Sequence, residues 1–544
     1  MAVIDGGGSR VTDSRGAGAR HAGPAPAGPW QPGPTSAGPW HATARPPRTL
    51  AEIASRVGAR LLAGAVDAAA GPVVTGISQD SRTVVPGDLY VALAGASWHG
   101  ARFIAQAAAA GAVAALVEPS ESGLVPPGAG LPTVDVTDLR RRIGPLASWL
   151  HGEPSSAMDV FGVTGTNGKT STAYLLEAGL AADGHRTGLV SGVAVRGPGG
   201  SRPAVRTTPE ATDLQRLLAV FAGQGVSAAA VEVSSHGLEL NRVDGTVFRA
   251  AVFTNLGRDH LDMHTDMAGY YAAKARLFGS DRCGLAVIGL DDRWGRRLAA
   301  EAQVPVVTFA GAGAPEPADW TARDVQATVA GTSFRFTGPG VDVPVRLGLL
   351  GAHQADNATG AIAALVSTGT DVQAAVRGVE SLSGVPGRLE RVDIGQSFTA
   401  FVDYVHNESG QARVYPFLRS LGSGRLIVVM GATGDRDPGK REPLGRNAGS
   451  VADVVVVTDE SPHSEDPAAL RNTTVAGARA GGRAQVLVEP DRAAAFDLAV
   501  SLARPGDVMV VSGRGHDPTQ FGNGTSRTFD DRVQLRAALQ RHAH

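Results

Sequence analysis

The segment VFGVTGTNGKTSTAYLLEAGLAADG (residues 160–184) decides the fold of this chain. Its first residues are apolar, a loop with glycines follows, and the remainder has helical periodicity, so the segment predicts a strand, a loop and a helix. On both sides of it the chain continues to alternate strand-like apolar runs with helical stretches. This alternation indicates an α/β fold with mostly parallel sheets.

The loop of this segment, GVTGTNGKTS (162–171), contains residue types that bind phosphate. It does not match the strict P-loop spacing, because the first glycine of that motif is missing five residues before Gly168. Gly165 and Gly168 still let backbone amides approach a phosphate. Lys169 can reach the outer phosphates of a nucleotide, and Thr170 can place its hydroxyl on Mg²⁺ at a helix N-terminus. The loop therefore predicts nucleotide binding, and the alternative is an ordinary glycine turn.

Length and composition divide the chain into a tail and three parts. The 544 residues correspond to three or four domains at about 150 residues each. Residues 1–47 are rich in Gly, Ala and Pro, which predicts a disordered tail. We expect three α/β domains in the remainder, at residues 48–150, 151–385 and 386–544.

Composition also excludes several classes of protein. The 50 basic and 52 acidic residues give a net charge of −2. This is not the excess of positive charge that is typical of proteins that bind nucleic acid. Cys283 is the only cysteine, so no intramolecular disulfide can form. No apolar run approaches the ~20 residues of a membrane span, and the N-terminus MAVIDGGGSR lacks a signal-peptide pattern. We expect a cytoplasmic monomer that binds small molecules and neither nucleic acid nor membrane.

Lysine is rare in this chain. Lys169, Lys274 and Lys440 are the only three among the 50 basic residues, which leaves 47 arginines. A chain that otherwise uses arginine keeps lysine where a compact ammonium or a modifiable amine is required. We therefore expect all three lysines to lie in functional motifs, and the alternative is chance survival.

Two further strand ends carry polar residues. In AAVEVSSHGLELNRVDG (229–245) the apolar run ends at Glu232. In FTNLGRDHLDMHTDMAGYYAAKARLF (253–278) a strand is followed by Asp259 and His260. Glu and His at strand ends are plausible Mg²⁺ ligands, and for each of them the alternative is a polar surface residue.

Eleven segments, in order along the chain, carry a resemblance to a known family. They are DSRTVVPGDLYVAL, GVTGTNGKTST, TTPEATDLQ, EVSSHGLELNRV, FTNLGRDHLD, YYAAKARLF, GVPGRLERVD, GATGDRDPGKR, SEDP, GRGHD and FDDR. In this order they resemble the Mur ligases, and within them the UDP-N-acetylmuramoyl-tripeptide synthetases, over about residues 50–540. The resemblance implies an N-terminal domain that binds the UDP substrate, a P-loop ATPase central domain and a Rossmann-like C-terminal domain that binds the incoming amino acid.

The resemblance also implies an ATP-dependent amide ligation. ATP phosphorylates a substrate carboxylate, and the amine of an amino acid displaces phosphate from the acyl phosphate. By resemblance the nucleotide phosphates contact Gly165, Thr166, Asn167, Gly168, Lys169, Thr170 and Ser171. The implied metal ligands for Mg²⁺ are Thr170, Glu232, His260 and Lys274, and the implied catalytic residues are Lys169, Lys274, His260 and Glu232. Lys274 would act as a carbamate derived from CO₂, which requires a neutral amine and so explains why arginine does not replace it.

Further residues are assigned to the nucleotide and to the UDP-sugar acceptor by the same resemblance. The implied nucleotide contacts are Asn357, Arg388, Asp403, His406, Asp435, Arg436 and Lys440. The implied acceptor contacts are Ser81, Arg82, Thr207, Thr208, Ser234 and Arg242. The chain departs from the family pattern at SWHGARFI (97–104), GLDD (289–292) and DYVHNES (403–409).

The loop TDESPHSEDP (458–467) resembles the part of the family that holds the incoming amino acid. The implied donor contacts are Glu460, Ser461, His463, Gly513 and Asp517. In diaminopimelate-adding members an arginine binds the distal carboxylate of the donor with two hydrogen bonds. His463 stands at that position and is largely neutral near pH 7, and losing such a contact costs about 1.5–3 kcal/mol. We therefore expect an altered donor, and the alternative is that another arginine compensates.

Three functions stay open at this point. The first is addition of the third residue to UDP-N-acetylmuramoyl-L-alanyl-D-glutamate in peptidoglycan precursor synthesis. The second is a diverged paralogue that uses the same chemistry on another acid and amine in specialised metabolism, which the changes at DYVHNES, GLDD and DESPH favour. The third is a nucleotide-binding module without catalysis, against which Lys169, Glu232, His260 and Lys274 argue.

Overall fold

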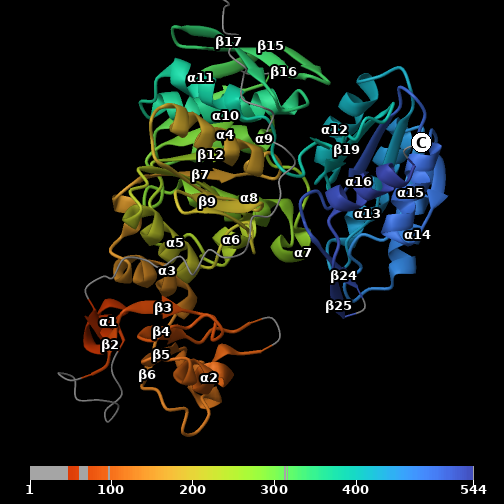
Figure 1. Ribbon diagram of the computed structural model, residues 1–544. Coiled ribbons are helices and arrows are strands. Elements are labelled where there is room, and N and C mark those ends of the chain that lie inside the picture. Colours follow the sequence, from red (N-terminus) through yellow and green to blue (C-terminus); the bar gives the residue numbers. More distant parts are fainter. Residues whose placement is uncertain are drawn as a thin grey trace, which may run out of the picture. The chain divides into compact units, whose positions relative to one another are not determined.

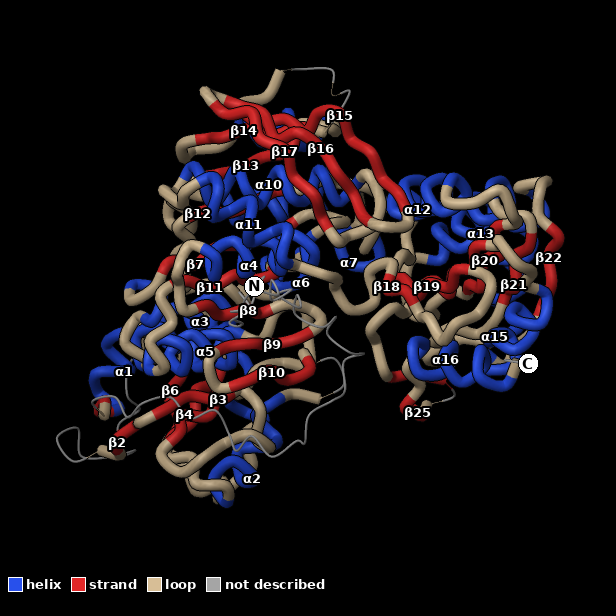
Figure 2. The backbone as a smooth tube through the Cα atoms, turned by 45° about the horizontal axis from the view of Figure 1, so that its top comes forward, coloured by secondary structure: helices blue, strands red, loops and turns tan. Residues whose placement is uncertain are grey.

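The computed structural model describes residues 47–59, 71–95, 98–311, 314, 317–522 and 524–542. Sheets of four, eleven and six strands dominate these ranges (Figures 1 and 2). The predicted tail at residues 1–47 lies outside the described residues, except for Pro47. None of the described helices combines the length and the apolar character that crossing a membrane requires.

The four-stranded sheet is parallel, with the order β3-β4-β5-β6. Its strands are β3 (Gly76–Ser78), β4 (Asp88–Val91), β5 (Ala114–Val117) and β6 (Thr133–Asp135). Around it lie β1 (Arg48–Thr49), α1 (Leu50–Arg56), β2 (Val73–Val74), η1 (Gly100–Phe103), α2 (Ile104–Ala109), η2 (Pro119–Leu124) and α3 (Leu139–Leu150). A capping box starts α1, because Glu52 N donates to Thr49 Oγ1 at 3.2 Å and Thr49 N donates to the Glu52 carboxylate at 2.8 Å. Ile53 of α1 and Leu146 of α3 are buried in the same core as the strands.

The eleven-stranded sheet has the order β10-β9-β8-β11-β7-β12-β13-β14-β15-β16-β17. Its first eight strands along the chain are β7 (Asp159–Thr164), β8 (Thr187–Val190), β9 (Ala194–Gly197), β10 (Gly200–Pro203), β11 (Ala228–Glu232), β12 (Ala250–Phe253), β13 (Ala286–Gly289) and β14 (Val306–Ala310). Its helices are η3 (Pro154–Ser156), α4 (Lys169–Ala182), α5 (Ala211–Gly223), α6 (Ser235–Glu239), α7 (Leu261–His264), α8 (Met267–Ala275), η4 (Arg276–Phe278), α9 (Arg293–Glu301), α10 (His353–Ser367) and α11 (Val372–Ser381). Val163 of β7 pairs in parallel with Glu232 of β11 and with Val252 of β12. The carboxyl ends of these three strands therefore meet at one edge, where α/β sheets bind their ligands.

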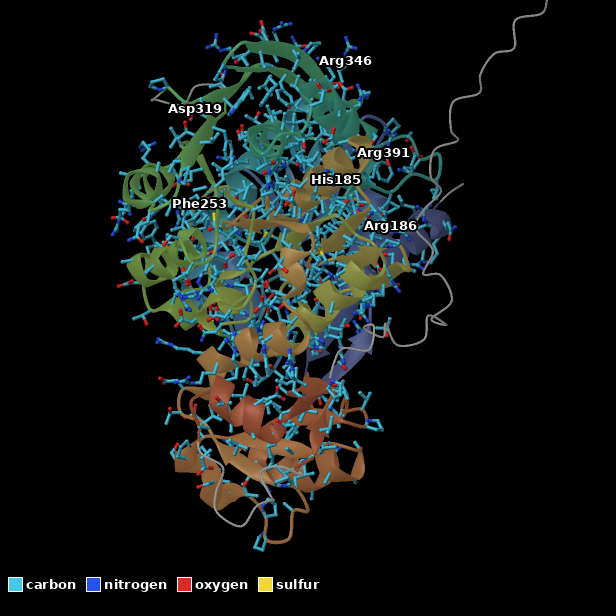
Figure 3. All side chains as sticks on the ribbon, turned by 90° about the vertical axis from the view of Figure 1, so that its left-hand side faces the viewer. His185, Arg186, Phe253, Asp319, Arg346 and Arg391 are labelled. Carbon is cyan, nitrogen blue, oxygen red and sulfur yellow. The ribbon has the colours of Figure 1, made fainter. Side chains whose placement is uncertain are left out.

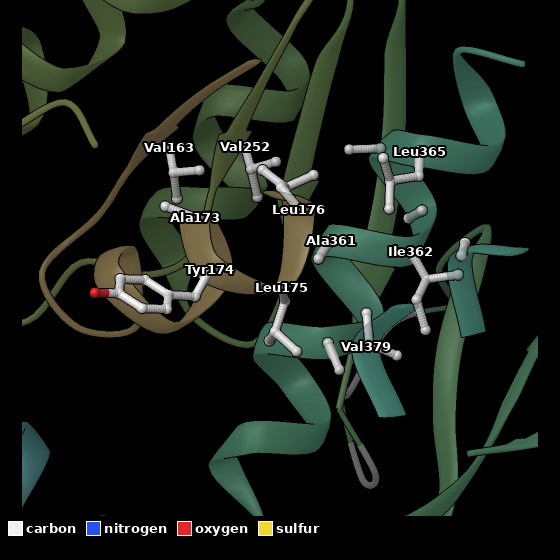
Figure 4. Close-up of a cluster of buried hydrophobic side chains, with 14 of the residues drawn as sticks. Val163, Ala173, Tyr174, Leu175, Leu176, Val252, Ala361, Ile362, Leu365 and Val379 are labelled. Carbon is white, nitrogen blue, oxygen red and sulfur yellow. The ribbon is translucent and has the colours of Figure 1, made fainter. Parts of the chain in front are cut away.

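Apolar packing fixes helix α4, and with it the loop that precedes the helix. Leu175 and Leu176 of α4 are fully buried in a cluster with Val163, Ile362 of α10 and Val379 of α11 (Figure 4). Burying each such side chain stabilises the fold by about 1.5–3 kcal/mol. The start of α4 is thus held rigidly against the sheet.

The expectation that strands and helices alternate up to residue 385 is wrong over residues 320–347. Here β15 (Trp320–Thr328), β16 (Gly331–Gly338) and β17 (Val341–Leu347) run antiparallel without intervening helices. The sequence alternates with a period of two, which suits a sheet with one solvated face. Phe334, Phe336, Val345 and Leu347 are buried, whereas Arg346 is exposed (Figure 3).

The six-stranded sheet has the order β18-β19-β23-β20-β21-β22, and all pairs except β18 with β19 are parallel. Its strands are β18 (Glu390–Arg391), β19 (Thr399–Asp403), β20 (Leu426–Met430), β21 (Val454–Val457), β22 (Gln485–Val488) and β23 (Val508–Ser512), and β24 (Thr519–Gly522) and β25 (Thr525–Thr528) form a separate hairpin. The helices are α12 (Glu408–Ser420), η5 (Pro438–Lys440), α13 (Arg441–Val451), α14 (Pro467–Ala480), α15 (Arg492–Leu502) and α16 (Asp531–Arg541). Val428 packs with α12, α13 and α14, and its neighbour Val429 packs with α15 and α16 on the opposite face.

These layers confirm the predicted α/β fold class, with a central P-loop-type sheet and a doubly wound third sheet. The exact residue boundaries of the three domains stay a prediction.

Candidate active site

The phosphate loop between β7 and α4 leaves no room for side chains at its two glycines. Gly165 and Gly168 have φ angles of 146° and 86°, which favour glycine. A Cβ on Gly165 would collide with Thr254 Oγ1, and a Cβ on Gly168 would collide with Asn357 Oδ1. The structure thus places Asn357, an expected nucleotide contact, directly beside the loop. Its Nδ2 donates to Gln354 Oε1 at 2.9 Å.

Two of the three lysines converge on this loop. Lys169 Nζ donates to Gly165 O at 3.1 Å and to Thr166 O at 2.9 Å, and Lys274 Nζ donates to Gly165 O at 2.8 Å. Lys274 is only 1% exposed, and its Nζ lies 4.7 Å from the centre of the Tyr270 ring. Burial lowers the pKa of both lysines, and it holds the pKa of Lys274 well below its usual value. Burial therefore favours the neutral form of the Lys274 amine.

Thr170 and Glu232 bring two hard oxygen donors to the N-terminus of α4. Thr170 Oγ1 donates to Glu232 Oε2 at 3.1 Å, and Gly192 N donates to the same oxygen at 2.8 Å. Arg388 Nη2 in turn donates to Thr170 Oγ1 at 2.9 Å. Within the described ranges no group of three or more His, Cys, Asp or Glu could hold a metal ion. A hydroxyl with one carboxylate nevertheless fits Mg²⁺, because this ion is usually bound through one or two carboxylates, waters and substrate phosphates.

His260 lies in a cluster of rings after β12. Its ring centre lies 4.9 Å from that of His236 and 6.1 Å from that of Tyr270, and its Nε2 lies 3.8 Å from Asp259 Oδ2. Burial holds the pKa of His260 well below its usual value and lowers that of His236 to about 4. Both imidazoles are therefore neutral near pH 7, which is the form that ligates metals. The metal-ligand role of His260 stays a prediction.

Asp259 is a central residue of the site that the sequence-based assignment left out. It is 3% exposed, and its carboxylate lies 3.4 Å from His406 Nε2 and 3.7 Å from Lys440 Nζ. Asn407 Nδ2 donates to it at 3.2 Å. Burial alone would raise the pKa of Asp259, but His406, His260 and Lys440 hold it well below its usual value. The adjacent pair Asp259-His260 after β12 could have indicated this residue, but only His260 was assigned a role from the sequence.

Side chains from residues 387–516 also contact the phosphate loop and its surroundings. Asn407 Nδ2 donates to Asn167 Oδ1 at 3.0 Å, and Asn167 Nδ2 donates to Ser409 Oγ at 2.9 Å. His516 Nε2 lies 3.0 Å from Gly192 O. Asn407 and Ser409 belong to DYVHNES, so residues that depart from the family pattern make contacts at the loop.

Arg388 and Asp403 were both expected to contact the nucleotide, and the structure gives them different surroundings. The Arg388 guanidinium lies 4.5 Å from the centre of the Tyr404 ring and reaches Thr170. The buried Asp403 carboxylate accepts from Leu389 N at 2.6 Å and from Val405 N at 2.7 Å, and burial raises its pKa. Asp403 therefore fixes the two backbone segments that carry Arg388 and His406.

The expected acceptor residues of the first sheet lie in the loop after β3. Ser81 is buried, and its Oγ donates to Gln106 Oε1 at 3.2 Å. Arg82 is exposed and binds the Asp80 carboxylate with hydrogen bonds of 2.8 and 2.7 Å. In the same loop Gln79 Nε2 donates to Glu210 Oε2 at 3.0 Å, which links it to the segment TTPE.

The residues of the central sheet that are expected to contact the UDP-sugar acceptor form one hydrogen-bonded group. Thr208 is fully buried, donates to Glu232 O at 2.9 Å and accepts from Ser234 N at 2.9 Å, so its hydroxyl is already used by the protein. Ser234 caps α6. Arg242 pairs with Glu210 at 2.6 Å and donates to Thr208 O at 3.3 Å.

Thr207 and the carboxylate of Glu232 both lie close to Gly192. Its Oγ1 is 3.2 Å from the position that a Cβ on Gly192 would occupy, and Glu232 Oε2 is 3.5 Å from the same position. Of these two threonines, Thr207 is the one with an exposed fraction available to a ligand.

The loop after β21 holds three of the five expected donor residues, Glu460, Ser461 and His463, and the other two, Gly513 and Asp517, follow β23. Glu460 is 5% exposed and accepts from Thr433 Oγ1 at 2.5 Å. Gly513 has φ 112°, and a Cβ there would collide with Glu460 Oε2. His463 stacks on Phe521 with ring centres 5.0 Å apart, and burial lowers its pKa, so it carries no charge near pH 7.

Four more expected residues lie around this loop. Ser461 Oγ accepts from Phe521 N at 3.3 Å, and burial raises the pKa of Asp517. Asp435 is exposed and accepts from Ser464 Oγ at 2.6 Å. Arg436 is exposed and donates to Asp435 O at 3.0 Å. The structure therefore places Asp435 and Arg436 beside the donor loop, and their assignment to the nucleotide stays a prediction.

Three family models match the chain. They are "Mur ligase family, catalytic domain" at residues 73–149, "Mur ligase middle domain" at residues 163–365 and "Mur ligase, glutamate ligase domain" at residues 387–515.

Individual proteins are similar to most of its length. UDP-N-acetylmuramoyl-L-alanyl-D-glutamate--2,6-diaminopimelate ligase from Streptomyces avermitilis is 46% identical over 504 residues, which are 92% of this chain and 97% of that protein. A solved structure of a UDP-N-acetylmuramoyl-L-alanyl-D-glutamate--2,6-diaminopimelate ligase has a TM-score of 0.57 at 31% identity and covers 87% of this chain and 96% of its own. Folylpolyglutamate synthase from Mycobacterium tuberculosis, solved with ADP and AMPPCP, has a TM-score of 0.58 at 25% identity and covers 69% and 92%.

Proposed function

The chain belongs to the Mur ligase family, and from this premise we propose that it joins an amino acid to UDP-N-acetylmuramoyl-L-alanyl-D-glutamate in peptidoglycan precursor synthesis. The enzyme is an ATP-dependent acid–amino-acid ligase that forms ADP. The similar protein from Streptomyces avermitilis is named as a ligase that acts on this acceptor. The structural observation that supports the proposal most is the Thr170–Glu232 pair at the phosphate loop, with Arg388 bound to the same hydroxyl.

In the first step, a carboxylate oxygen of the acceptor attacks the γ-phosphorus of ATP, and the bond from that phosphorus to ADP breaks. Both reactants are anions, so cations must hold them together. Thr170 and Glu232 would hold Mg²⁺, which when bound neutralises phosphate charge. Lys169 moves from the loop carbonyls to the outer phosphates, and the N-terminus of α4 binds the phosphates through backbone amides.

Lys274 has the chemistry that carbamate formation requires. Its neutral Nζ adds to the carbon of CO₂ and loses a proton, and the product is an anion with two oxygens. This anion would support the metal together with Glu232 and the neutral His260. Burial of the amine at 1% exposure supports this assignment, because a charged lysine could not react.

In the second step, the amine of the donor attacks the acyl carbon, phosphate leaves, and the nitrogen releases a proton. An acyl phosphate must be kept from water until the amine arrives. The contacts of Asn407 with Asn167 and of His516 with Gly192 support such exclusion, because they cover the loop from residues of the third sheet. We propose that the enzyme works in the cytoplasm, where both nucleotide substrates occur, and as a monomer.

The donor loop favours a second candidate, a diverged paralogue that uses the same two steps on another acid and amine. The observation behind it is the neutral His463 beside the buried Glu460 carboxylate. A nucleotide-binding module without catalysis is the third candidate. It differs by binding ATP without amine-dependent release of phosphate.

Phosphate release by the full-length protein tests the proposal. ATP, Mg²⁺ and UDP-N-acetylmuramoyl-L-alanyl-D-glutamate are supplied with a panel of amino acids, and UDP-N-acetylglucosamine replaces the acceptor as a blank. We expect release only when acceptor and amine are both present. Glu232→Gln should lower kcat at least about 100-fold, in the range measured for lost electrostatic groups. Glu442→Gln, the same exchange on the exposed side of α13, should change kcat less than about twofold.

Several results would contradict the proposal. Release without the acceptor would make the protein a simple ATPase. An unchanged kcat in the Glu232→Gln variant would show that the metal does not bind at Glu232. ATP binding without release for any amine would support the module without catalysis.

A further inference from the structure

The first turn of helix α12 packs against the phosphate loop and against the loop after β12. Asn167 Nδ2 donates to Ser409 Oγ at 2.9 Å, and a Cβ on Gly257 would collide with the same oxygen. Ser409 is the second residue of α12, and Asn407 caps the helix. Moving α12 away from the central sheet would therefore uncover the phosphate loop on this side.

Arg413 continues this contact one helical turn further along α12. It lies four residues after Ser409, so both side chains lie on the same face of the helix. Arg413 Nη1 donates to Asp356 Oδ2 at 3.0 Å. Asp356 belongs to α10 and directly precedes Asn357, whose Oδ1 fills the space beside Gly168. The ion pair therefore joins the two helices that contact adjacent residues of the phosphate loop.

The carboxylate of Asp356 lies beside a second carboxylate. A Cβ on Gly311 would collide with Asp356 Oδ1 and would lie 3.4 Å from Asp291 Oδ1, so both side chains point to the same place. Burial raises the pKa of Asp356 to about 7, Arg413 opposes this rise, and Asp291 adds to it. No other basic side chain among the described residues forms an ion pair with Asp356. Without α12 in place, Asp356 would face Asp291 with no cation beside it.

Charge distinguishes this contact from the neighbouring contacts of α12. Ser409 and Asn167 are neutral, whereas the contact of Arg413 with Asp356 is a hydrogen bond between charged groups, which is roughly twice as strong. Both ends of the pair lie on helices rather than on loops. The pair is therefore suited to hold α12 in one position relative to α10.

We propose that Asp356 and Arg413 are positioning residues that hold α12 over the phosphate loop while the acyl phosphate waits for the amine. The inference rests on the proposed function and adds a pair that the two chemical steps do not use. If α12 moves away, the oxygen of a water attacks the acyl carbon, phosphate leaves, a proton is released and the acceptor carboxylate is restored. ATP is then hydrolysed without formation of an amide.

The ratio of phosphate released to amide formed measures this loss. Both products are determined in the same reaction at about pH 8, above the pKa of Asp356. We expect a ratio of about one for the wild type, because each acyl phosphate is used once. Loss of active molecules through misfolding would lower both products together and leave the ratio unchanged.

Asp356→Asn and Arg413→Gln each remove the ion pair. The side chains of Arg413 and Asp356 are 44% and 23% exposed, so solvent screens the pair in part. We expect hydrolysis relative to amide formation to rise about threefold to thirtyfold in each variant, between the values for exposed pairs and for pairs in interfaces. KM for the donor amino acid should change less than about twofold, since the donor loop keeps its contacts.

A double-mutant cycle assigns the effect to the pair. The double variant should give the same ratio as either single variant, because both substitutions remove one and the same contact. Arg413→Lys keeps the charge and should restore the wild-type ratio in part. The control is Glu442→Gln with Arg446→Gln, which removes an ion pair on the exposed side of α13 and should leave the ratio unchanged.

The outcomes separate failure of the inference from failure of the proposed function. A wild-type ratio in both single variants would refute the inference, and so would independent losses that add up in the double variant. If the wild type forms no amide with any amino acid, the proposed function fails. Calorimetry with ADP and Mg²⁺ then still tests the pair. The wild type should bind ADP about threefold to thirtyfold more tightly than each variant, and equal affinities would refute the inference.

Discussion

Replacing Lys274 by methionine should change how the stability of the protein depends on pH. In the folded protein burial holds the pKa of this side chain well below its usual value and favours the neutral amine, whereas in the unfolded chain the amine is charged at pH values below about 10.4. Unfolding therefore takes up one proton, and the free energy of unfolding rises with pH by about 1.4 kcal/mol per pH unit. Methionine has a similar length and does not titrate.

The size of the change in unfolding free energy can be worked out over one pH unit just below the ordinary pKa of lysine. Between pH 8.5 and 9.5 the wild type should gain about 1.4 kcal/mol of unfolding free energy relative to Lys274→Met. The lost hydrogen bond from Nζ to Gly165 O at 2.8 Å adds an offset of about 1 kcal/mol that does not depend on pH.

Urea unfolding of both proteins measures the difference, in buffer free of CO₂ and metal, with tryptophan fluorescence as the probe. The central sheet and its helices contain Trp294 and Trp320. Bicarbonate, Mg²⁺ and ADP should then raise the unfolding midpoint of the wild type more than that of Lys274→Met, because only the wild type has the amine that the proposed carbamate requires. Parallel pH curves for the two proteins would show that the folded Lys274 is charged and would refute the reasoning.

Two further changes probe contacts of the third sheet. Asn407→Asp keeps a good helix cap. It replaces the amide that donates to Asn167 and Asp259 by a carboxylate with the same charge as Asp259. We therefore expect kcat/KM to fall about 30-fold to 1000-fold, which corresponds to about 2–4 kcal/mol. A fall of less than threefold in steady-state kinetics would contradict a role for these contacts. Asp531→Asn leaves the fully buried Arg492 without its counter-charge and should cost about 3–5 kcal/mol in urea unfolding. Arg492→Met with Asp531→Leu should restore most of this loss, and an unchanged unfolding midpoint in the single variant would refute the argument.

Local pattern was sufficient to locate the phosphate loop and its partner strand. The loop follows an apolar strand, and the end of β11 carries Glu232. Parallel register places Glu232 opposite Val163, so two strand ends predicted separately come together at Thr170. The antiparallel strands at residues 320–347 were missed because their period-two pattern was read as part of the alternation of strands and helices.

Sequence alone could not tell which polar residues the protein uses for itself. Asp403 and Thr208 stand in motifs, yet their oxygens bind backbone groups of their own chain. The hydrogen bonds that join Gln411 to Tyr415 and Tyr415 to Ser512 had no signal at all, because they connect segments about 100 residues apart. Such roles follow from hydrogen-bond geometry between distant segments.

The scarcity of lysine gives the protein an unusual surface chemistry. Lys274 and Lys440 are 1% and 8% exposed, and Lys169 folds back onto the phosphate loop. Apart from the terminal amine, an acylating reagent therefore finds its primary amines only around the nucleotide site. Labelling should inactivate the enzyme, and bound ATP should protect it. Lysine-specific proteolysis of the denatured chain can cut at three positions, and a carbamate trapped on Lys274 would remove one of them.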